Sequence, residues 1–376
     1  MAKRRATEVA SADSESGPVP NLIRRIERRR SLDAEAPWPR TAKIELARVW
    51  ASPDVKISTS RRQSAAPSQG LIVSAAAGST FGGPPDIAIE RPSRPILRGL
   101  APDARAQAEG HRPAHLAVHF RPAGLHKVES LEPRERTRRG GAIFAPDDRY
   151  IYQDASFPWC TVGLIETENG WGSGTMIGRR LVLTASHVVV WKTNSAGWMK
   201  FTPAAFGGTT PPFGHAWAER VIYWRKNGHR MNDDETAFDY AVLVLDRGLG
   251  ELTGYAGFRT FDTAWLAGRY WQNLGYPGDI GGGTKPSFSN SGAISSVDDF
   301  TSQQQTAYLL GNFIDYQPGQ SGGPYWGWWG EEPWPRVIGT ASTLPDTPSN
   351  DTSGDNEGGG GPALSSLVAY ARTQYP

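Results

Sequence analysis

The chain has 376 residues, 40 Lys and Arg against 38 Asp and Glu, and a single cysteine. This length accommodates one large domain or two ordinary ones. One cysteine excludes an intramolecular disulfide framework and any zinc module built from several cysteines. Because no stretch approaches the ~20 apolar residues of a transmembrane helix, we expect no membrane span.

The near-neutral total hides two unlike parts of the chain. Residues 1–140 hold 25 basic against 15 acidic residues, and residues 141–376 hold 15 against 23. The first part has four aromatic residues and no tyrosine, whereas the second has 35 aromatic residues. Folding must offset about 1–2 kcal/mol of chain entropy per residue, and the first part has few large apolar side chains for this. We predict a basic, largely disordered region over 1–140, with one short helix near 21–31, and a folded domain over 143–376.

The N-terminal region contains three patterns that could carry a function. MAKRR at the start is followed by polar residues, so we expect no Sec signal peptide. The run RRIERRR (24–30) suits an anionic surface, but a solvated basic face is the simpler reading, and we do not expect nucleic-acid binding. His111, His115 and His119 are spaced like metal ligands on a helix, but nearby prolines interrupt such a helix. We therefore expect no metal and no cofactor.

From residue 150 onward, short β-type runs alternate with turn residues, a pattern that predicts an all-β barrel or sandwich. The runs cover 161–166, 174–178, 180–185, 220–224, 240–245, 307–314 and 336–341, with turn clusters between them, the last at 345–362. The final segment, 362–375, has Leu364, Leu367 and Val368 on one helical stripe and is the one convincing helix.

Three short sequences combine the groups needed for acyl transfer by a serine. LTASHVV contains His187 at the end of an apolar strand, FDYAVLVL contains Asp239 at the start of another, and PGQSGGP contains Ser321 in a glycine-rich turn. A serine nucleophile needs a base to accept its proton and a carboxylate to orient that base. Each sequence alone is weak, but their order, with gaps of 52 and 82 residues, predicts a Ser–His–Asp triad.

The turn around Ser321 also suits stabilisation of an oxyanion. Gly319, Gly322 and Gly323 let the backbone turn without a side chain blocking the substrate. We predict that the backbone N–H groups of Gly319 and Ser321 point at one spot, where they would donate to the developing negative charge.

These motifs resemble the chymotrypsin-like (trypsin-fold) serine endopeptidases. That resemblance implies two six-stranded antiparallel β-barrels with the site in the cleft between them, and it covers roughly residues 143–376. GSGTMIG (172–178), GYPGD (275–279), NSGAIS (290–295) and AIFAPDDRY (142–150) are similar to the bacterial glutamyl-endopeptidase branch. The resemblance implies His187 as general base, Asp239 as its orienting group and Ser321 as nucleophile. It also implies protein or peptide substrates and a monomer.

Two departures from the family pattern bear on cysteine pairing and activation. Val188 follows the predicted base where many animal members have a bridged cysteine, so Cys160 is expected to be an unpaired core residue. Gln320 precedes the nucleophile where trypsin-type zymogens have the aspartate that pairs with a newly freed N-terminus. That activation salt bridge cannot form here.

The residues of the specificity pocket leave substrate preference open. Asp315 lies six residues before Ser321, where trypsin-type enzymes place the carboxylate that binds a substrate Arg or Lys. The glutamyl-endopeptidase branch also carries Asp at this offset without a basic preference. That branch recognises substrate Glu partly through a histidine, and the matching position in this chain is Ala341. The resemblance assigns Asp315 and the neighbouring Ser342 to substrate binding.

Two loops have both a structural and a functional interpretation. The aromatic segment 325–334 is expected to be a hairpin that covers a barrel, with a substrate- or glycan-contacting surface as the alternative. The acidic segment 346–361 offers oxygen ligands but lacks the spacing of an EF-hand, so calcium binding is the minority interpretation.

The leading hypothesis is a serine endopeptidase made as a precursor, cleaved between Arg138 and Ile143 in the segment PRERTRRGGAIF. An ordinary linker in a protein that works at full length is the alternative for this segment. A catalytically silent module of the same fold, with a basic tail that binds an anionic surface, is the alternative function. The resemblance suggests an extracellular protein, although no export signal is recognisable.

Overall fold

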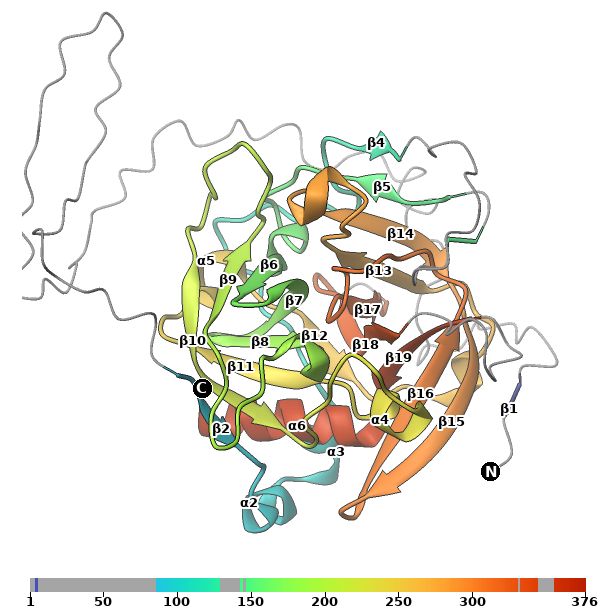
Figure 1. Ribbon diagram of the computed structural model, residues 1–376. Helices are drawn as coiled ribbons and strands as arrows, with labels where there is room; N and C mark the ends of the chain where they lie inside the picture. The colour runs from blue at the N-terminus through green and yellow to red at the C-terminus, as the bar shows by residue number, and fades with distance from the viewer. Residues whose placement is uncertain (1–3, 6–85, 129–142, 145–146, 331, 344–354) are drawn as a thin grey trace, which may run out of the picture. The chain divides into compact units, whose positions relative to one another are not determined.

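The computed structural model describes residues 4–5, 86–128, 143–144, 147–330, 332–343 and 355–376. These residues belong to one compact unit of the chain. They form two antiparallel β-barrels and a long C-terminal helix (Figure 1). The predicted all-β class with a C-terminal helix is confirmed. The basic run at 24–30, the helix expected near 21–31, and the cleavage segment 138–142 lie outside the described residues.

The first barrel is closed and has six strands. Its strands pair in the order β11-β8-β7-β6-β9-β10, and β10 pairs back with β11. Their bounds are β6 Val162–Thr167, β7 Gly170–Gly178, β8 Leu181–Thr184, β9 Met199–Pro203, β10 Ala216–Tyr223 and β11 Ala241–Leu245. The runs predicted at 161–166, 174–178, 180–185, 220–224 and 240–245 all fall on these strands. Their inward side chains, such as Ile165, Val182 and Leu243, are fully buried.

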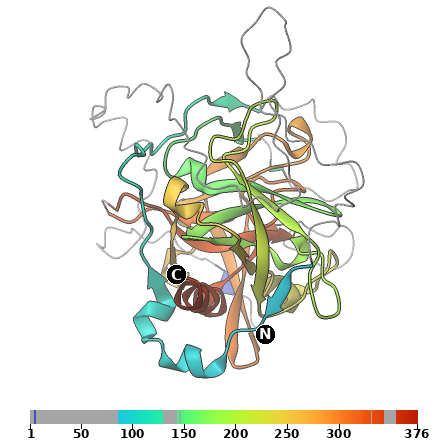
Figure 2. The same ribbon diagram turned by 90° about the vertical axis from the view of Figure 1, so that its left-hand side faces the viewer.

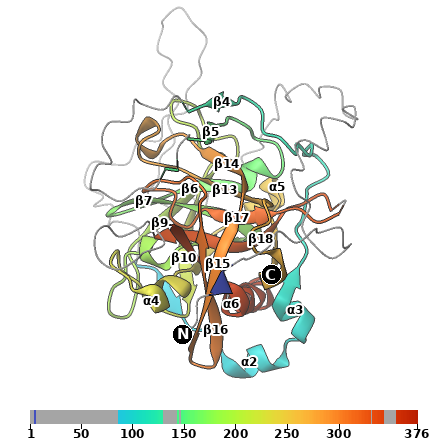
Figure 3. The ribbon, with the colours of Figure 1, turned by 90° about the vertical axis from the view of Figure 1, so that its right-hand side faces the viewer.

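The second barrel is part of a larger sheet and has six strands when β14 and β15 are counted as one bent strand. Its strands are β13 Trp271–Gly275, β14 Ser287–Gly292, β15 Ile294–Ser302, β16 Gln305–Asn312, β17 Pro324–Gly327, β18 Arg336–Thr343 and β19 Asn356–Gly360. β13 pairs with both β14 and β17, and the order continues through β18, β19 and β16 to β15. Only Ala293 separates β14 from β15, so the two are one bent strand that closes the ring. Figure 3 shows the long β15–β16 hairpin of this barrel.

The glycine-rich end of the acidic segment was predicted to be a turn, but it forms a strand. Residues Asn356–Gly360 form β19, which pairs with both β16 and β18 inside the second barrel. Glycine is a poor strand former by itself. Here a Cβ on Gly358 would lie 2.3 Å from the Tyr325 ring, so this close approach requires glycine. Residues 346–354 of the acidic segment 346–361, for which calcium binding was the alternative interpretation, lie outside the described residues.

The aromatic segment after Ser321 is a structural element, as its first interpretation held. Trp326, Trp328 and Trp329 are all buried, and β17 pairs with β13 and β18. The Trp329 ring makes edge-to-face and tilted contacts with the Trp265 and Trp271 rings in the core of the second barrel. The described residues of this segment therefore complete a barrel wall.

Helix α6 (Gly361–Gln374) is the predicted C-terminal helix, and it packs against both barrels. Its Leu364, Leu367 and Val368 are fully buried, as the helical stripe indicated. The Arg372 guanidinium donates to the carbonyl groups of Ile177 and Ala256, which attaches the last turn to the first barrel. Among the described residues, no helix is long and apolar enough to cross a membrane.

Residues 86–128, which we call the strap, are part of the folded unit. This corrects the prediction that the folded domain starts near Ile143. The strap contains β2 Ala88–Glu90, α2 Arg94–Gly99, α3 Pro102–Ala106, β3 Gln107–Ala108 and β4 His126–Lys127. β2 adds to β10 as a parallel strand, β3 pairs with β12 (Gly257–Arg259), and β4 pairs with β5 (Tyr150–Ile151). In Figure 2 the strap runs past α6 along one side of the barrels.

The strap packs through a small number of well-placed side chains rather than through aromatic residues. Ile87 is buried in the core of the first barrel, and Leu97 is buried in the cluster around α6. The Glu90 carboxylate accepts hydrogen bonds from Tyr370 and Tyr375 at 2.6 and 2.5 Å. Composition underestimated this region because the barrels and α6 supply the apolar surface that the strap itself lacks.

The remaining described elements are short. Helices α4 (Asp233–Ala237) and α5 (Gly250–Thr253) connect strands of the first barrel to their neighbours, and β1 (Arg4–Arg5) pairs with β15. Cys160 is buried and unpaired, and its thiol contacts the Thr253 carbonyl, as expected of a core cysteine.

Candidate active site

His187 lies in a single 3₁₀ turn directly after β8 of the first barrel. The four residues of β8 are all buried, and the chain turns out of the barrel at Ser186–Val188. The Ser186 hydroxyl donates to the Arg225 carbonyl at 2.7 Å, which fastens this turn. The side chain of His187 keeps 9% of its surface exposed, so it is accessible from the cleft.

Asp239 is fully buried just before β11 and receives four hydrogen bonds. Its Oδ1 accepts from the backbone N–H of His187 at 2.9 Å and from the Asn227 amide at 3.3 Å. Its Oδ2 accepts from His187 Nδ1 and from the Ser342 hydroxyl, each at 2.5 Å. The carboxylate thus holds the imidazole with Nδ1 as donor, which leaves Nε2 without the proton when the ring is neutral.

The two groups shift one another's pKa in opposite directions. Burial alone would lower the pKa of His187, but the Asp239 charge and hydrogen bond outweigh burial and raise it above the usual value. Burial would also raise the pKa of Asp239, but His187 and the Ser342 hydroxyl keep it below the usual value. Asp239 is therefore ionised over the whole range in which His187 titrates.

Ser321 lies in a tight loop of the second barrel, before β17. Gly319 and Gly322 have φ of +99° and +82°, a backbone region that favours glycine. A Cβ on Gly322 would lie 2.3 Å from the Thr184 hydroxyl, so the loop can approach the end of β8 only with glycine there. The Ser321 carbonyl accepts from the Ser173 N–H at 2.8 Å, which joins the loop to the first barrel.

Two backbone N–H groups of this loop have no hydrogen-bond acceptor among the described residues, namely those of Gly319 and Ser321. The Pro318 carbonyl accepts from the Gly278 N–H at 2.8 Å, and the Ser173 hydroxyl donates to the Gly319 carbonyl at 2.8 Å. Because a trans peptide directs its N–H opposite to its C=O, the Gly319 N–H points away from Gly278.

His187 and Ser321 line one cleft of about 560 Å³. The cleft also contains backbone and side chains from the β6–β7 hairpin, the segment after β8, the segment after β10, and the loop before Ser321. Its further lining residues are Thr167, Asn169, Gly170, Trp171, Val188, Val189, Val190, Trp191, Asn227, Gly228, His229, Gly278, Pro318 and Gly319. The structure thus brings His187, Asp239, Gly319 and Ser321 together from both barrels.

Asp315 does not line this cleft, which disagrees with its assignment to substrate binding. Its carboxylate is buried and accepts the backbone N–H groups of Phe144 and Asp148 at 2.6 and 2.9 Å. Burial raises its pKa to about 7, and the neighbouring Asp148 and Asp147 charges add to that. Both carboxylate oxygens of Asp315 thus accept from backbone N–H groups of the segment that leads into β5, so this side chain fastens that segment.

Ser342 and Ala341 also differ from what the resemblance implied. Ser342 is buried on β18, and its hydroxyl donates to Asp239 rather than facing the cleft. Ala341 is fully buried and is absent from the cleft lining. Ser342 is therefore a partner of the buried carboxylate, and its sequence context alone could not distinguish the two roles.

Several residues that complete the site had no signal in the sequence. Asn227 and Trp171 lie in no motif quoted above, and Ser173 lies in GSGTMIG (172–178), which gave no sign of its contact with the Ser321 loop. Asn227 donates to Asp239, Ser173 bonds the Gly319 carbonyl, and Trp171 forms part of the cleft. Only their tertiary contacts identify them.

The three histidines of the strap contact three different partners. His111 pairs through its backbone with Tyr255, the His115 ring contacts the Leu252 carbonyl, and His119 contacts the Asp154 carboxylate at 3.4 Å. Within the described ranges, no group of three or more His, Cys, Asp or Glu side chains is arranged to hold a metal ion.

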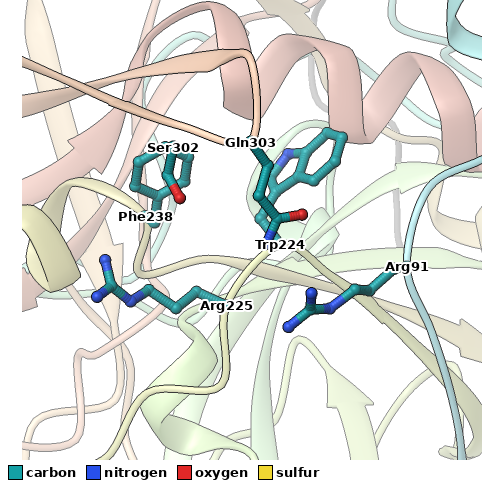
Figure 4. A pocket seen from close by; sticks show the side chains of 6 residues that line it. All are labelled: Arg91, Trp224, Arg225, Phe238, Ser302 and Gln303. Atoms are coloured by element: carbon teal, nitrogen blue, oxygen red, sulfur yellow. The ribbon is translucent and has the colours of Figure 1, made fainter. Parts of the chain in front are cut away.

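A second, smaller cavity of about 240 Å³ lies where the strap, the first barrel and the tip of the β15–β16 hairpin meet (Figure 4). It is lined by Arg91, Trp224, Arg225, Phe238, Ser302 and Gln303. Both guanidinium groups already have partners, because Arg225 bonds Asp234 and Arg91 lies over the Tyr223 ring. This cavity shares no lining residue with the cleft at Ser321.

Two antiparallel barrels, with His187 and Asp239 on the first and Ser321 on the second, match the architecture that the chymotrypsin-like resemblance implied. No family model matches the chain. The chain is 30% identical over 202 residues to the glutamyl endopeptidase of Bacillus licheniformis, covering 53% of this chain and 58% of that relative. The resemblance to chymotrypsin-like serine endopeptidases of the glutamyl-endopeptidase branch is thereby confirmed.

A further relative and two solved structures complete the comparison. The chain is 29% identical over 163 residues to a Bacillus subtilis protein named extracellular metalloprotease, covering 41% of this chain and 50% of the relative. The matched part of this chain thus spans about half the length of each of these two curated relatives. A solved Glu endopeptidase covers 62% of this chain and 100% of its own, at 20% identity and TM-score 0.46. The solved structure of the protease Anisep from Arthrobacter nicotinovorans covers 60% of this chain and 99% of its own, at 18% identity and TM-score 0.40.

Proposed function

We propose that the protein is a serine endopeptidase that hydrolyses peptide bonds through an acyl-enzyme on Ser321. The observation that carries this proposal is the hydrogen bond at 2.5 Å between the buried Asp239 carboxylate and Nδ1 of His187, a histidine that lines the same cleft as Ser321. A carboxylate in this position fixes the tautomer and orientation of a histidine base. The 30% identity to a glutamyl endopeptidase supports the same reaction class.

In the first half of the reaction, Ser321 Oγ attacks the substrate carbonyl carbon while His187 Nε2 accepts the hydroxyl proton. The electron pair of the carbonyl moves to its oxygen, and the unpaired N–H groups of Gly319 and Ser321 donate to that oxyanion. Asp239 stays ionised and stabilises the imidazolium. The intermediate then collapses, the C–N bond breaks, and His187 gives its proton to the leaving amine.

In the second half, water replaces the leaving amine beside His187. His187 Nε2 accepts a proton from the water, whose oxygen attacks the ester carbonyl. Collapse of this second intermediate breaks the bond to Ser321 Oγ, which takes the proton back from His187. The product acid leaves, and the enzyme returns to its starting state without any cofactor.

The proposed peptidase domain consists of residues 143–376 together with the strap. The strap is included because it contributes β2 to the first barrel and buries Ile87 and Leu97. Protein or peptide substrates and a monomeric state are parts of the same proposal.

The test compares wild type with Ser321→Ala and His187→Ala. We expect labelling by a fluorophosphonate probe in wild type and none in Ser321→Ala. Peptide hydrolysis should fall by on the order of 10⁴–10⁶ in kcat in either variant, because triad members act as a unit. Activity within tenfold of wild type would reject the assignment. Absence of labelling and hydrolysis in folded wild type would favour the catalytically silent module instead.

A further inference from the structure

The cleft beside Ser321 exposes a large aromatic side chain to solvent. Trp171, at the start of β7, keeps 42% of its surface exposed. Among the described residues, the other exposed large hydrophobic side chains are Leu252 and Phe313, and neither lines the cleft. An indole left open next to the proposed nucleophile is surface that a bound group can remove from water.

Trp171 is held in place, so its exposed surface is preformed. The indole Nε1 donates to the Tyr276 carbonyl at 3.0 Å. The ring lies against glycine backbone, because a Cβ on Gly319 would approach its Nε1 to 2.5 Å, and one on Gly278 would lie 3.3 Å from the ring. The indole therefore rests directly beside Gly319, one of the two proposed oxyanion donors. A rigid ring binds a second ring with little loss of conformational entropy.

The cleft contains a second indole and further apolar side chains. Trp191 is fixed by a 2.9 Å hydrogen bond from its Nε1 to the Ser186 carbonyl. Val189 and Pro318 add aliphatic surface to the lining. The volume of about 560 Å³ is large enough for one bulky side chain and part of a peptide backbone.

The charge of the cleft disfavours a basic side chain. No Asp or Glu is present among its described lining residues, so a bound Lys or Arg would lack a counter-ion. The titratable side chains in that lining are His187 and His229, whose ring centroids are 5.7 Å apart. Apolar surface with few ionisable groups suits an uncharged, aromatic side chain.

We propose that this cleft is a subsite that binds an aromatic substrate side chain against Trp171. The inference rests on the proposed peptidase function. Because the same cleft contains Ser321 and His187, the bound side chain belongs to a residue close to the scissile bond. Trp171 selects the substrate by offset or edge-to-face contact between rings, the arrangements that aromatic pairs prefer.

The experiment uses internally quenched peptides that differ at one position at a time on both sides of the scissile bond, with Phe, Leu, Ala, Glu or Lys there. The measured quantity is the ratio of kcat/KM for Phe over Ala at each position. For wild type we expect a ratio of about 10 or more at one position. In Trp171→Ala the Phe/Ala ratio at that position should fall to within about threefold of unity. In Trp171→Phe, which keeps an aromatic ring, the ratio should stay close to that of wild type.

Because Trp171 packs on Gly319, a proposed oxyanion donor, its substitution could lower the reactivity of Ser321 towards every peptide. The Phe/Ala ratio cancels such a general loss. Trp217→Ala is the matched control, since Trp217 is a half-exposed tryptophan on β10 outside the cleft, and its ratio should equal that of wild type. An unchanged Phe/Ala ratio in Trp171→Ala would overturn the inference, as would a wild-type preference for Glu or Lys at that position. Failure of wild type to cleave any peptide or to label at Ser321 would count against the proposed function instead.

Discussion

The side-chain amide of Gln320 donates to Asn273 Oδ1 at 3.0 Å, directly beneath the loop that carries Ser321. Gln320 is fully buried, and its Oε1 accepts the backbone N–H of Gln317 at 3.1 Å. The Asn273 amide in turn donates to the Pro324 carbonyl at 3.1 Å. Neutral amides thus hold both ends of the nucleophile loop from within the second barrel.

This network predicts that the chain is reactive before any cleavage. A buried aspartate at position 320 would need the charge of a new N-terminus, whereas buried Gln320 is satisfied by the loop and by Asn273. We expect full-length protein with Arg138→Ala and Arg139→Ala to label with a fluorophosphonate at a rate within about threefold of wild type. N-terminal sequencing of the labelled protein is the check. Labelling only in molecules that begin between residues 140 and 143 would contradict this and support the precursor hypothesis.

Activity should rise with pH through an apparent pKa above the ordinary histidine value of about 6.5. Asp239 raises the pKa of His187, and the base must be neutral to accept the Ser321 proton. The active fraction therefore grows as pH rises through that raised pKa and is lost below it. A pH profile of kcat/KM from 5 to 9 measures it, and a flat profile with rate-limiting chemistry would be incompatible.

Ser342→Ala should lower kcat with little change in KM. The Ser342 hydroxyl bonds Asp239 and is buried away from the cleft, so its loss weakens the orientation of the triad and not substrate binding. Hydrogen bonds to a charged group contribute about 1.5–3 kcal/mol, which corresponds to roughly a 10- to 100-fold loss. Steady-state kinetics on one peptide distinguish the roles. A rise in KM at constant kcat would instead indicate that Ser342 contributes to substrate binding.

Asp315→Asn should flatten the dependence of stability on pH. Burial raises the folded-state pKa of Asp315 to about 7, above its unfolded value near 3.8. The folded state therefore keeps a proton that the unfolded chain releases, and the stability that this proton provides below pH 4 is lost as pH rises towards 7. The variant cannot titrate there. Thermal unfolding midpoints at pH 4.5, 6 and 8 should vary less than in wild type, and an equal or steeper dependence would refute the effect.

Deleting residues 1–85 should leave the fold and activity intact, whereas deleting 1–128 should not. The second deletion removes β2 and the buried Ile87 and Leu97, and it leaves the Glu90 partners Tyr370 and Tyr375 unpaired. Loss of a fully buried aliphatic side chain alone costs roughly 2–5 kcal/mol. Thermal unfolding of both truncated proteins tests this. Equal midpoints would mean that the strap is dispensable.

The sequence by itself determined the features that local patterns encode. Short β-type runs between turn clusters predicted five of the six strands of the first barrel, all but β9, and the apolar stripe on 362–375 predicted α6. His187, Asp239 and Ser321 were identifiable because each follows or precedes a strand in a short, characteristic motif. These are properties of a few consecutive residues.

Only the tertiary structure decided which partner each polar group meets. Asp315 and Ser342 both sit at positions where the family places substrate contacts, yet one binds the segment before β5 and the other binds Asp239. The strap, β19 and Trp171 were missed for the same reason. Their stability and exposure depend on surfaces contributed by residues far away in the chain, and such contacts leave no period or motif in the sequence.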